Sequence, residues 1–169
     1  MIEPTVAPRF ACRERGMTLL ESLVAVLVFS IGLLALVGML ALSVATAGEA
    51  QYRIEATNHA QSLLQSMRSG VRRSPTGEVD RAHFVLFGHA AASGATPCDF
   101  SGAPSGETIV QEWLRRVTDA RSGLPGTAGT AWQQVAVDPD RFNEVRVTLC
   151  WKQPSESQVH RHEVVGNVN

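Results

Sequence analysis

A long uncharged apolar run constrains this chain more than any other feature. No charged residue lies between Ser22 and Gly48, and no proline lies between Met17 and Ser74. About 20 apolar residues, each rising 1.5 Å in a helix, span the roughly 30 Å hydrocarbon layer of a bilayer. The run therefore predicts one membrane-spanning helix.

One acidic residue, Glu21, lies a single helical turn inside the apolar block. A carboxylate at this depth is costly unless its charge is offset or its side chain reaches the headgroup layer. From the residues alone two interpretations stay open: Glu21 snorkels to water, or it pairs with a cation.

The residues around Glu21 resemble a known processing signal, the type IV prepilin signature, in the stretch Arg15-Gly16-Met17-Thr18-Leu19-Leu20-Glu21. In that family a prepilin peptidase cuts after the glycine, the new N-terminus is methylated, and the fifth mature residue is glutamate. Glu21 is fifth when counted from Met17. The first mature residue is most often phenylalanine in the family, and here it is Met17. The resemblance implies cleavage between Gly16 and Met17, N-methylation of Met17 and an assembly role for Glu21.

The resemblance also implies a mechanism for Glu21. Cleavage would create a cationic amine on Met17, and Glu21 of one subunit could pair with that amine on a neighbouring subunit. In a low-dielectric helix bundle such a pair acts chiefly by penalising wrong registers, because an unpaired buried charge is much worse than a paired one. Glu21 is then a docking residue and not a catalytic one.

Residues 1–16 read as a processed leader, since they contain two prolines and end in basic residues. Arg9, Arg13 and Arg15 lie on the N-terminal side of the apolar run. The positive-inside rule then places the N-terminus in the cytoplasm and the residues from about 49 onward in the periplasm. The expected location is the bacterial inner membrane, as a single-pass protein, followed by the pilus fibre or its tip.

The helix is predicted to continue past the membrane to about Arg73, because apolar residues recur at spacings of three and four. These residues are Tyr52, Ala56, Ala60, Leu63, Leu64, Met67 and Val71. The expected divisions are 1–16 as leader, 17–48 as the transmembrane and assembly half of the helix, 49–74 as its amphipathic half, and 75–169 as a periplasmic head.

The head is predicted to be α+β. A short buried strand is expected at His83–Phe87, a loop over 90–106 and a helix at Glu107–Arg121. Three strands joined by short turns are expected at Trp132–Val137, Glu144–Lys152 and Gln158–Val165. An antiparallel meander of this kind, packed on the amphipathic half of the long helix, is the type IV pilin fold that the resemblance implies.

The order of features downstream resembles minor pilins of the PilV type, the type IV pilus modification proteins. These features are Cys98, a helix bearing Trp113, a Leu124-Pro125-Gly126 loop and a strand from Val145 to Trp151. The resemblance implies a low-abundance subunit that initiates or modifies the fibre, with an effect on adhesion or motility. The implied partners are the major pilin, other minor pilins, prepilin peptidase, the inner-membrane assembly machinery and, before assembly, membrane lipid.

The chain contains three cysteines, at Cys12, Cys98 and Cys150. Cys12 lies in the leader and is expected to be free and then lost. Cys98 and Cys150 both fall in the periplasmic part, where a disulfide can form and persist. Two separately buried thiols are the alternative.

Composition and motifs give little support for catalysis. The net charge of −1 and the pI near 6.5 offer no signal for nucleic-acid binding. His160 and His162 share one face of a predicted strand, but no third metal ligand has suitable spacing, and His83 and His89 are the other histidines of the head. Ser93, Ser101 and Ser105 lack a nucleophile-elbow context, and no phosphate-binding glycine loop is present. We expect no metal, no cofactor and no enzyme activity.

Two other interpretations remain. A pseudopilin of a type II secretion system would share the same N-terminus. A single-pass membrane-anchored enzyme or binding module would make Gly16 incidental.

The mass of the protein extracted from membranes separates these interpretations. Both pilin interpretations predict the loss of residues 1–16 and the gain of one methyl group on Met17. An intact chain from Met1 to Asn169, measured by mass spectrometry, would remove both of them.

Overall fold

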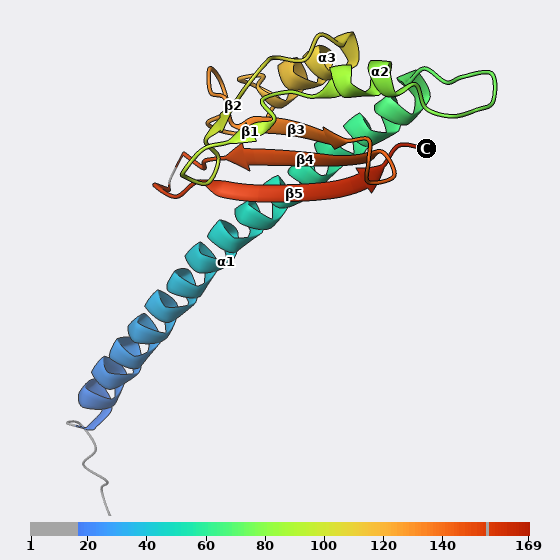
Figure 1. Ribbon diagram of the computed structural model, residues 1–169. Coiled ribbons are helices and arrows are strands. Elements are labelled where there is room, and N and C mark those ends of the chain that lie inside the picture. The colour runs from blue at the N-terminus through green and yellow to red at the C-terminus, as the bar shows by residue number, and fades with distance from the viewer. Residues whose placement is uncertain (1–16, 155) are drawn as a thin grey trace, which may run out of the picture. The chain divides into compact units, whose positions relative to one another are not determined.

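The computed structural model describes residues 17–154 and 156–169, without the side chains of residues 17 and 44–46. The chain forms two compact units, Met1–Ala47 and Gly48–Asn169, which are called here the N-terminal unit and the head. The helix α1 (Met17–Gly70) contributes residues to both units (Figure 1). The predicted leader lies outside the described residues.

The sheet of the head has three strands, β3 (Gln133–Asp138), β4 (Glu144–Trp151) and β5 (His160–Asn167). They are antiparallel in the order β3-β4-β5, with Val147 opposite both Val135 and Val164. The predicted antiparallel meander is therefore confirmed, and each strand begins and ends within two residues of its expected bounds. Alternating β-branched residues and short turns at Pro139 and Pro154 account for this agreement.

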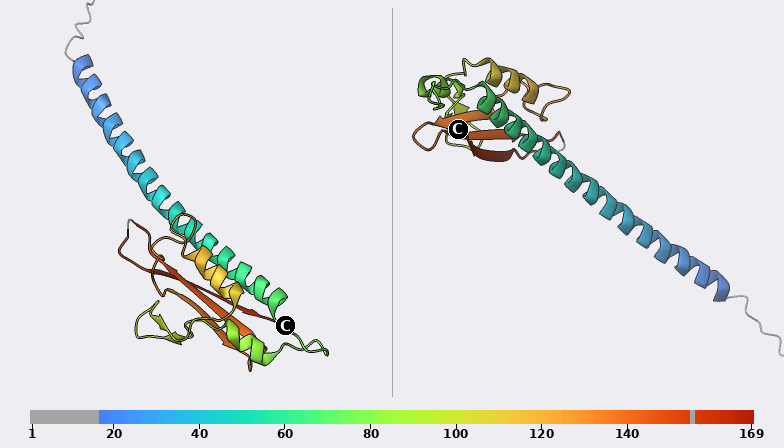
Figure 2. Two further views of the ribbon diagram at one scale, coloured as in Figure 1. Left: turned by 90° about the horizontal axis from the view of Figure 1, so that it is seen from above. Right: turned by 90° about the vertical axis from the view of Figure 1, so that its right-hand side faces the viewer.

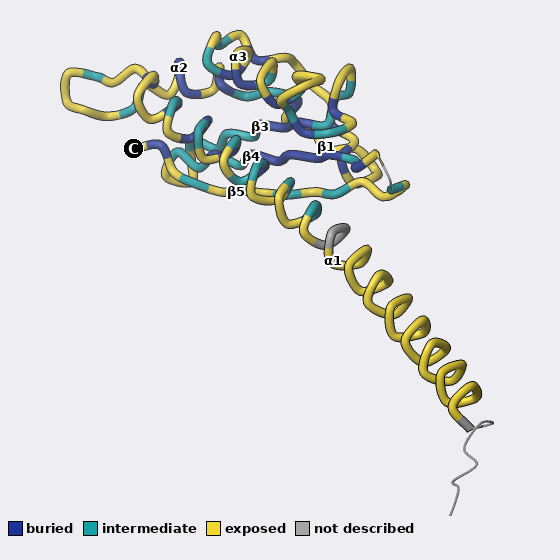
Figure 3. Tube along the Cα trace, turned by 180° about the vertical axis from the view of Figure 1, so that it is seen from behind, coloured by how far each residue is buried: buried dark blue, intermediate teal, exposed yellow. Residues whose placement is uncertain are grey.

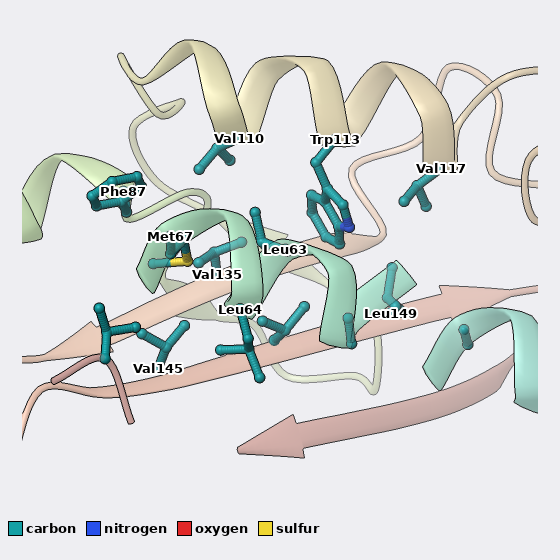
Figure 4. Close-up of a cluster of buried hydrophobic side chains, with 14 of the residues drawn as sticks. Leu63, Leu64, Met67, Phe87, Val110, Trp113, Val117, Val135, Val145 and Leu149 are labelled. Atoms are coloured by element: carbon teal, nitrogen blue, oxygen red, sulfur yellow. The ribbon is translucent and has the colours of Figure 1, made fainter. Parts of the chain in front are cut away.

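Two helices cover one face of this sheet. The part of α1 from Gly48 to Gly70 and the helix α3 (Thr108–Val117) lie side by side over the strands (Figure 2). The core between the two layers joins Leu63 and Met67 of α1 to Trp113 of α3 and Leu149 of β4, all fully buried (Figure 4). The amphipathic stripe predicted for α1 is the face that enters this core.

Trp113 links the two helices as well as filling the core. Its indole Nε1 donates a hydrogen bond of 2.9 Å to the main-chain oxygen of His59 in α1. A buried indole needs such a partner, because an unpaired N–H in an apolar core is costly.

The helix α1 ends at Gly70, three residues before the expected end at Arg73. Beyond Gly70 the amide of Arg72 donates to Nδ1 of His83 at 3.1 Å, and Asp80 donates its amide to the main-chain oxygen of Arg72. Partners outside the helix thus satisfy the backbone groups that would have continued it.

The helix α3 is also shorter than the expected span Glu107–Arg121 and ends at Val117. The carboxylate of Asp119 accepts hydrogen bonds from the amides of Arg121 and Ser122 and from the hydroxyl of Ser122. This local capture of the backbone by an aspartate side chain competes with helical hydrogen bonding.

The strand predicted at His83–Phe87 is wrong. These residues form α2 (Arg81–Phe84) and the 3-10 helix η1 (Val85–Phe87). The carboxylate of Asp80 caps α2 by accepting from the amides of Ala82 and His83. Phe84 and Phe87 are buried and Val85 is exposed, which is helical and not alternating spacing.

The loop predicted over 90–106 contains a short antiparallel pair, β1 (Ala92–Ser93) and β2 (Phe100–Ser101). This segment lies on the sheet face opposite α1 (Figure 1). It buries Thr148 and Cys150, although the alternation of these residues with Val147, Leu149 and Trp151 predicts a half-buried strand with Thr148 and Cys150 on its open face. As a result β4 is buried on both faces toward its C-terminal end, as the dark tube in Figure 3 shows.

Replacing Leu63 by alanine tests this core. Leu63 is fully buried between the layers, whereas Ile54 on the same helix is 61% exposed. We expect Leu63→Ala to lower the free energy of unfolding by about 2 to 5 kcal/mol, through lost burial and a residual cavity. Ile54→Ala, the matched control, should change it by less than about 0.5 kcal/mol. Chemical unfolding followed by tryptophan fluorescence measures both, and equal effects would contradict the packing described here.

Candidate assembly site

The N-terminal unit presents apolar side chains in every direction around α1. Leu19, Leu34 and Phe29 are each at least 70% exposed, and every residue from Thr18 to Ser43 is exposed. A helix that is apolar all round is stable only when lipid or other helices cover it. Length and composition make this helix a candidate membrane span.

The hydroxyl groups in this segment are satisfied within the helix. The Oγ atoms of Ser22 and Ser30 donate to the main-chain oxygens of Thr18 and Val26, each at 2.7 Å. Such bonds to the preceding turn remove the cost of placing a hydroxyl in lipid.

Glu21 differs from these serines. It is exposed, and its carboxylate forms no hydrogen bond or ion pair with any residue in 17–154 or 156–169. A carboxylate among apolar side chains needs a cation or strong donors when water is excluded. Glu21 is therefore an acidic group in 17–48 without a partner among the described residues of the chain.

The predicted processing position is only partly described. Gly16 lies outside the described residues, and the first described residue, Met17, is also the first residue of α1. Cleavage between Gly16 and Met17, N-methylation of Met17 and the loss of Cys12 with the leader stay predictions.

In the head, a disulfide joins Cys98 to Cys150 across a sequence separation of 52 residues, with a Cα–Cα distance of 6.0 Å. It connects the 90–101 segment to the central strand β4. A small cluster of Ala90, Phe100 and Trp132 packs around the two cysteines. The disulfide and this cluster hold the segment on the second face of the sheet.

Sequence reasoning missed this second layer because its strands are only two residues long and show no periodicity. One available signal was the position of Cys150 on the predicted open face of its strand. A disulfide from that face requires the segment around Cys98 to cover it.

The four histidines considered as metal ligands all have structural partners. His160 stacks on Trp151 with ring centroids 5.6 Å apart, and its Nε2 lies 2.6 Å from Oε2 of Glu156. His162 Nε2 lies 3.0 Å from the hydroxyl of Thr57. The described residues contain no group of three or more histidine, cysteine or acidic side chains that could hold a metal.

His83 and His89 join segments of the head. Nδ1 of His83 accepts from the amide of Arg72, and Nδ1 of His89 accepts from the amide of Ser105 at 3.3 Å. Burial lowers the pKa of His89 below its ordinary value, because the charged imidazolium is poorly solvated there. Burial also lowers the pKa of His59, with nearby Glu55 acting in the opposite direction.

The serines considered as nucleophiles also lie in structural settings. The Ser105 hydroxyl is buried, donates to the main-chain oxygen of Leu86 and accepts from the amide of Glu107. Ser93 Oγ lies 3.3 Å from Nε2 of Gln134, and Ser101 is exposed in β2.

A family model described as a prokaryotic N-terminal methylation motif matches residues 12–37. No curated protein and no solved structure matches the chain significantly. The motif is a type IV pilin-like prepilin signal, and it covers both the predicted cleavage position and Glu21.

The fold and the motif together define a class. An apolar N-terminal helix followed by a small antiparallel sheet is consistent with the α+β type IV pilin fold. The motif supports a type IV pilin-like or pseudopilin substrate of prepilin peptidase, and it indicates a structural subunit rather than an enzyme. Motif and helix also fit membrane anchoring with the head outside the cytoplasm.

The disulfide generates a prediction for the mature protein. We expect no free thiol when the protein is unfolded without reductant. Replacing both Cys98 and Cys150 by serine should lower the free energy of unfolding by about 4 kcal/mol, as the chain-entropy model gives for a loop of this length. Thiol titration and chemical unfolding measure these quantities. Two free thiols in the mature protein would show that the pair is not formed.

Proposed function

We propose that this protein is a minor pilin, a PilV-type subunit that helps to initiate or modify a type IV pilus. The observation that carries the proposal is Glu21, a carboxylate that has no partner among residues 17–154 and 156–169 and is the fifth residue after the predicted cleavage, within the matched methylation motif. The order of Cys98, Trp113, the Leu124-Pro125-Gly126 loop and the Val145–Trp151 strand supports the minor-pilin subtype.

The first step is processing. Prepilin peptidase cuts the bond between Gly16 and Met17 on the cytoplasmic side of the inner membrane, and the new amine of Met17 is methylated. A secondary amine keeps its proton at neutral pH. Processing therefore places a cation four residues from Glu21 at the end of an otherwise uncharged segment.

The second step is docking. When the apolar segment leaves lipid for a bundle of pilin helices, its all-round apolar surface gains contacts without exposing any side chain to water. In the bundle, Glu21 is either paired with the methylated amine of a neighbouring subunit or left without a partner, depending on the register of the helices. The register in which Glu21 pairs with the amine has the lower free energy, because an uncompensated buried charge costs several kcal/mol.

The head supplies the surface that distinguishes this subunit from its neighbours. Its core of α1, α3 and the sheet does not include Glu21, since that residue lies in the N-terminal unit. Folding of the head and docking of the N-terminal segment are thus separable, which allows each to be tested alone. The partners proposed for the assembled protein are the major pilin and other minor pilins.

A pseudopilin role in type II secretion rests on the same N-terminal motif. The two roles differ in the assembly that contains the mature protein. Recovery in sheared surface pili supports the minor-pilin role, and recovery only with a secretion complex supports the pseudopilin role.

Replacing Glu21 by alanine tests the docking role. We expect at least about a tenfold loss of incorporation into fibres, because one charge of a buried pair is then left uncompensated. Quantitative immunoblotting of sheared fibres against the membrane fraction measures the incorporated share.

The matched control is Ser30→Ala in the same apolar helix, which removes a hydroxyl already bonded within the helix. Ser30→Ala should enter fibres at the normal level. Both variants should retain the Cys98–Cys150 disulfide and the unfolding midpoint of the head. If Glu21→Ala is incorporated as well as the native protein, Glu21 has no docking role.

A further inference from the structure

The turn between β3 and β4 holds a phenylalanine ring away from the head. Phe142 is 84% exposed, more than Leu19 at 76% in the apolar N-terminal unit. The amide of Glu144 donates to the main-chain oxygen of Arg141 at 3.1 Å. The two residues between them, Phe142 and Asn143, have φ angles of 55° and 52°.

Phe142 is an unusual residue for this turn. Positive φ at both central residues is the pattern of a type I′ turn, which favours asparagine and glycine. Asn143 fits its position, but a bulky side chain is strained at positive φ. The strain at Phe142 is not offset by burial of its ring, because the ring is exposed.

Residues 167 and 168 hold the turn in place through three hydrogen bonds. Nδ2 of Asn167 donates to the main-chain oxygens of Phe142 at 3.0 Å and Arg141 at 3.5 Å. The amide of Val168 donates to the main-chain oxygen of Asn143 at 3.1 Å. An aromatic ring on a fixed backbone is a suitable anchor for a protein interface, because little conformational entropy is lost when it binds.

The charge available beside Phe142 is positive. Asp140 is paired with Arg81 at 2.7 Å, whereas the guanidinium of Arg141 is exposed and lies 3.9 Å from the carboxylate of Glu144. A contact of 3.9 Å is long for a charged hydrogen bond, so Arg141 can accept a second partner. The turn therefore fits an apolar hollow with acidic groups at its rim.

A hollow of this chemistry lies between α1 and the loop that follows α3. It has a volume of about 480 Å³, and its walls include Tyr52, Glu55, Asp119, Arg121, Leu124 and Pro125. Tyr52 and Leu124 belong to the apolar cluster of the head and supply an apolar wall. Glu55 and Asp119 place two carboxylates against the one guanidinium of Arg121. Hydrogen bonds from Ser122 and Arg121 lower the pKa of Asp119, so its carboxylate is ionised at neutral pH.

The turn and the hollow lie at opposite ends of the head (Figure 1). Asn167 contacts both the turn and Arg68, near the end of α1, whereas Tyr52 of the hollow lies near the start of the head. Positions 52 and 68 are about 24 Å apart along the helix axis, at 1.5 Å per residue. The ring therefore cannot enter the hollow of its own chain. A group and its complement at opposite ends of one molecule join copies head to tail, and such a contact does not close at two copies.

We propose that Phe142 of one copy inserts into the hollow of a second copy, where Arg141 faces Glu55 and Asp119. The second copy is the occupant because this chain carries both the ring with its cation and the hollow with its two carboxylates. Opposite charges at the two surfaces set the orientation of the contact. The contact joins heads, so it lies outside the docking role proposed for Glu21.

Sedimentation of the full-length protein in density-matched detergent tests the contact. We expect the native protein to associate beyond a dimer as its concentration rises. Phe142→Ala removes the ring, and Ala128→Trp fills the hollow from its exposed rim. Each variant alone should associate at least about tenfold more weakly. Val165→Ala removes an exposed apolar side chain elsewhere and should associate like the native protein.

An equal mixture of the two weakened variants separates this contact from any other association. The Phe142→Ala copy keeps the hollow and the Ala128→Trp copy keeps the ring. One contact can then form but no second one can follow it. We expect a dimer that does not grow with concentration. Circular dichroism melting confirms that each variant is folded.

A charge swap adds a second readout. Arg141→Glu should weaken association about threefold, because like charges then meet at the rim of the hollow. The double variant Arg141→Glu with Glu55→Arg should recover the association.

Several outcomes would overturn the proposal. The ring has no such role if the native protein stays monomeric or if Phe142→Ala associates as strongly as the native protein. A native dimer that does not grow would assign the contact to two-fold pairing. A mixture of the two variants that stays monomeric would show that the ring does not enter the hollow. All of these residues belong to the head, so the results do not depend on Glu21.

Discussion

The fold depends on one helix that meets two different environments along its length. Up to Ala47, α1 is apolar on every side and has no core of its own to enter. From Ala56 onward only one stripe is apolar, and that stripe supplies Leu63 and Met67 to the centre of the head. The sheet, α3 and the segment Phe84–Phe87 contribute further core residues, and α1 contacts both the indole of Trp113 and the β5 strand.

In the proposed function, assembly and folding use separate parts of one element. Burial of the stripe in α1 holds the head together through contacts within the chain. The N-terminal segment carries an apolar surface that is stable only in lipid or against other helices, and a carboxylate, Glu21, that needs a cationic partner when water is excluded. A chain organised this way can fold its head before it finds its neighbours, which suits a subunit that waits in a membrane before joining a fibre.

Much of this organisation could be predicted from the sequence where the pattern is long. The absence of charge from Ser22 to Gly48, the stripe from Ala56 to Val71 and the alternation in Val145–Trp151 each extend over several repeats. The prediction of α1 and the three strands followed from these patterns. Glu21 was found because a charge in an apolar run is conspicuous, and the matched motif covers it.

Prediction failed where short-range side-chain bonds decide the structure. Asp80 caps a helix of four residues at a place where the apolar run His83–Phe87 suggested a strand. Hydrogen bonds to the Asp119 carboxylate accompany the early end of α3. At the end of α1, the amide of Arg72 donates to His83 and not to a helix carbonyl. The layer at residues 90–101 depends on a disulfide and a few apolar side chains. Hydrophobic periodicity in the sequence does not predict a layer of this kind.

The parallel course of α1 and β5 has a mechanical consequence. Contacts follow one another along the whole strand, from Glu49 with His160, through Thr57 with His162 and Leu64 against Gly166, to Arg68 with Asn167. A tension applied along the helix loads these contacts in shear and at the same time, whereas a force across the helix would peel them off one by one. These contacts between α1 and β5 therefore share a force that is applied along α1.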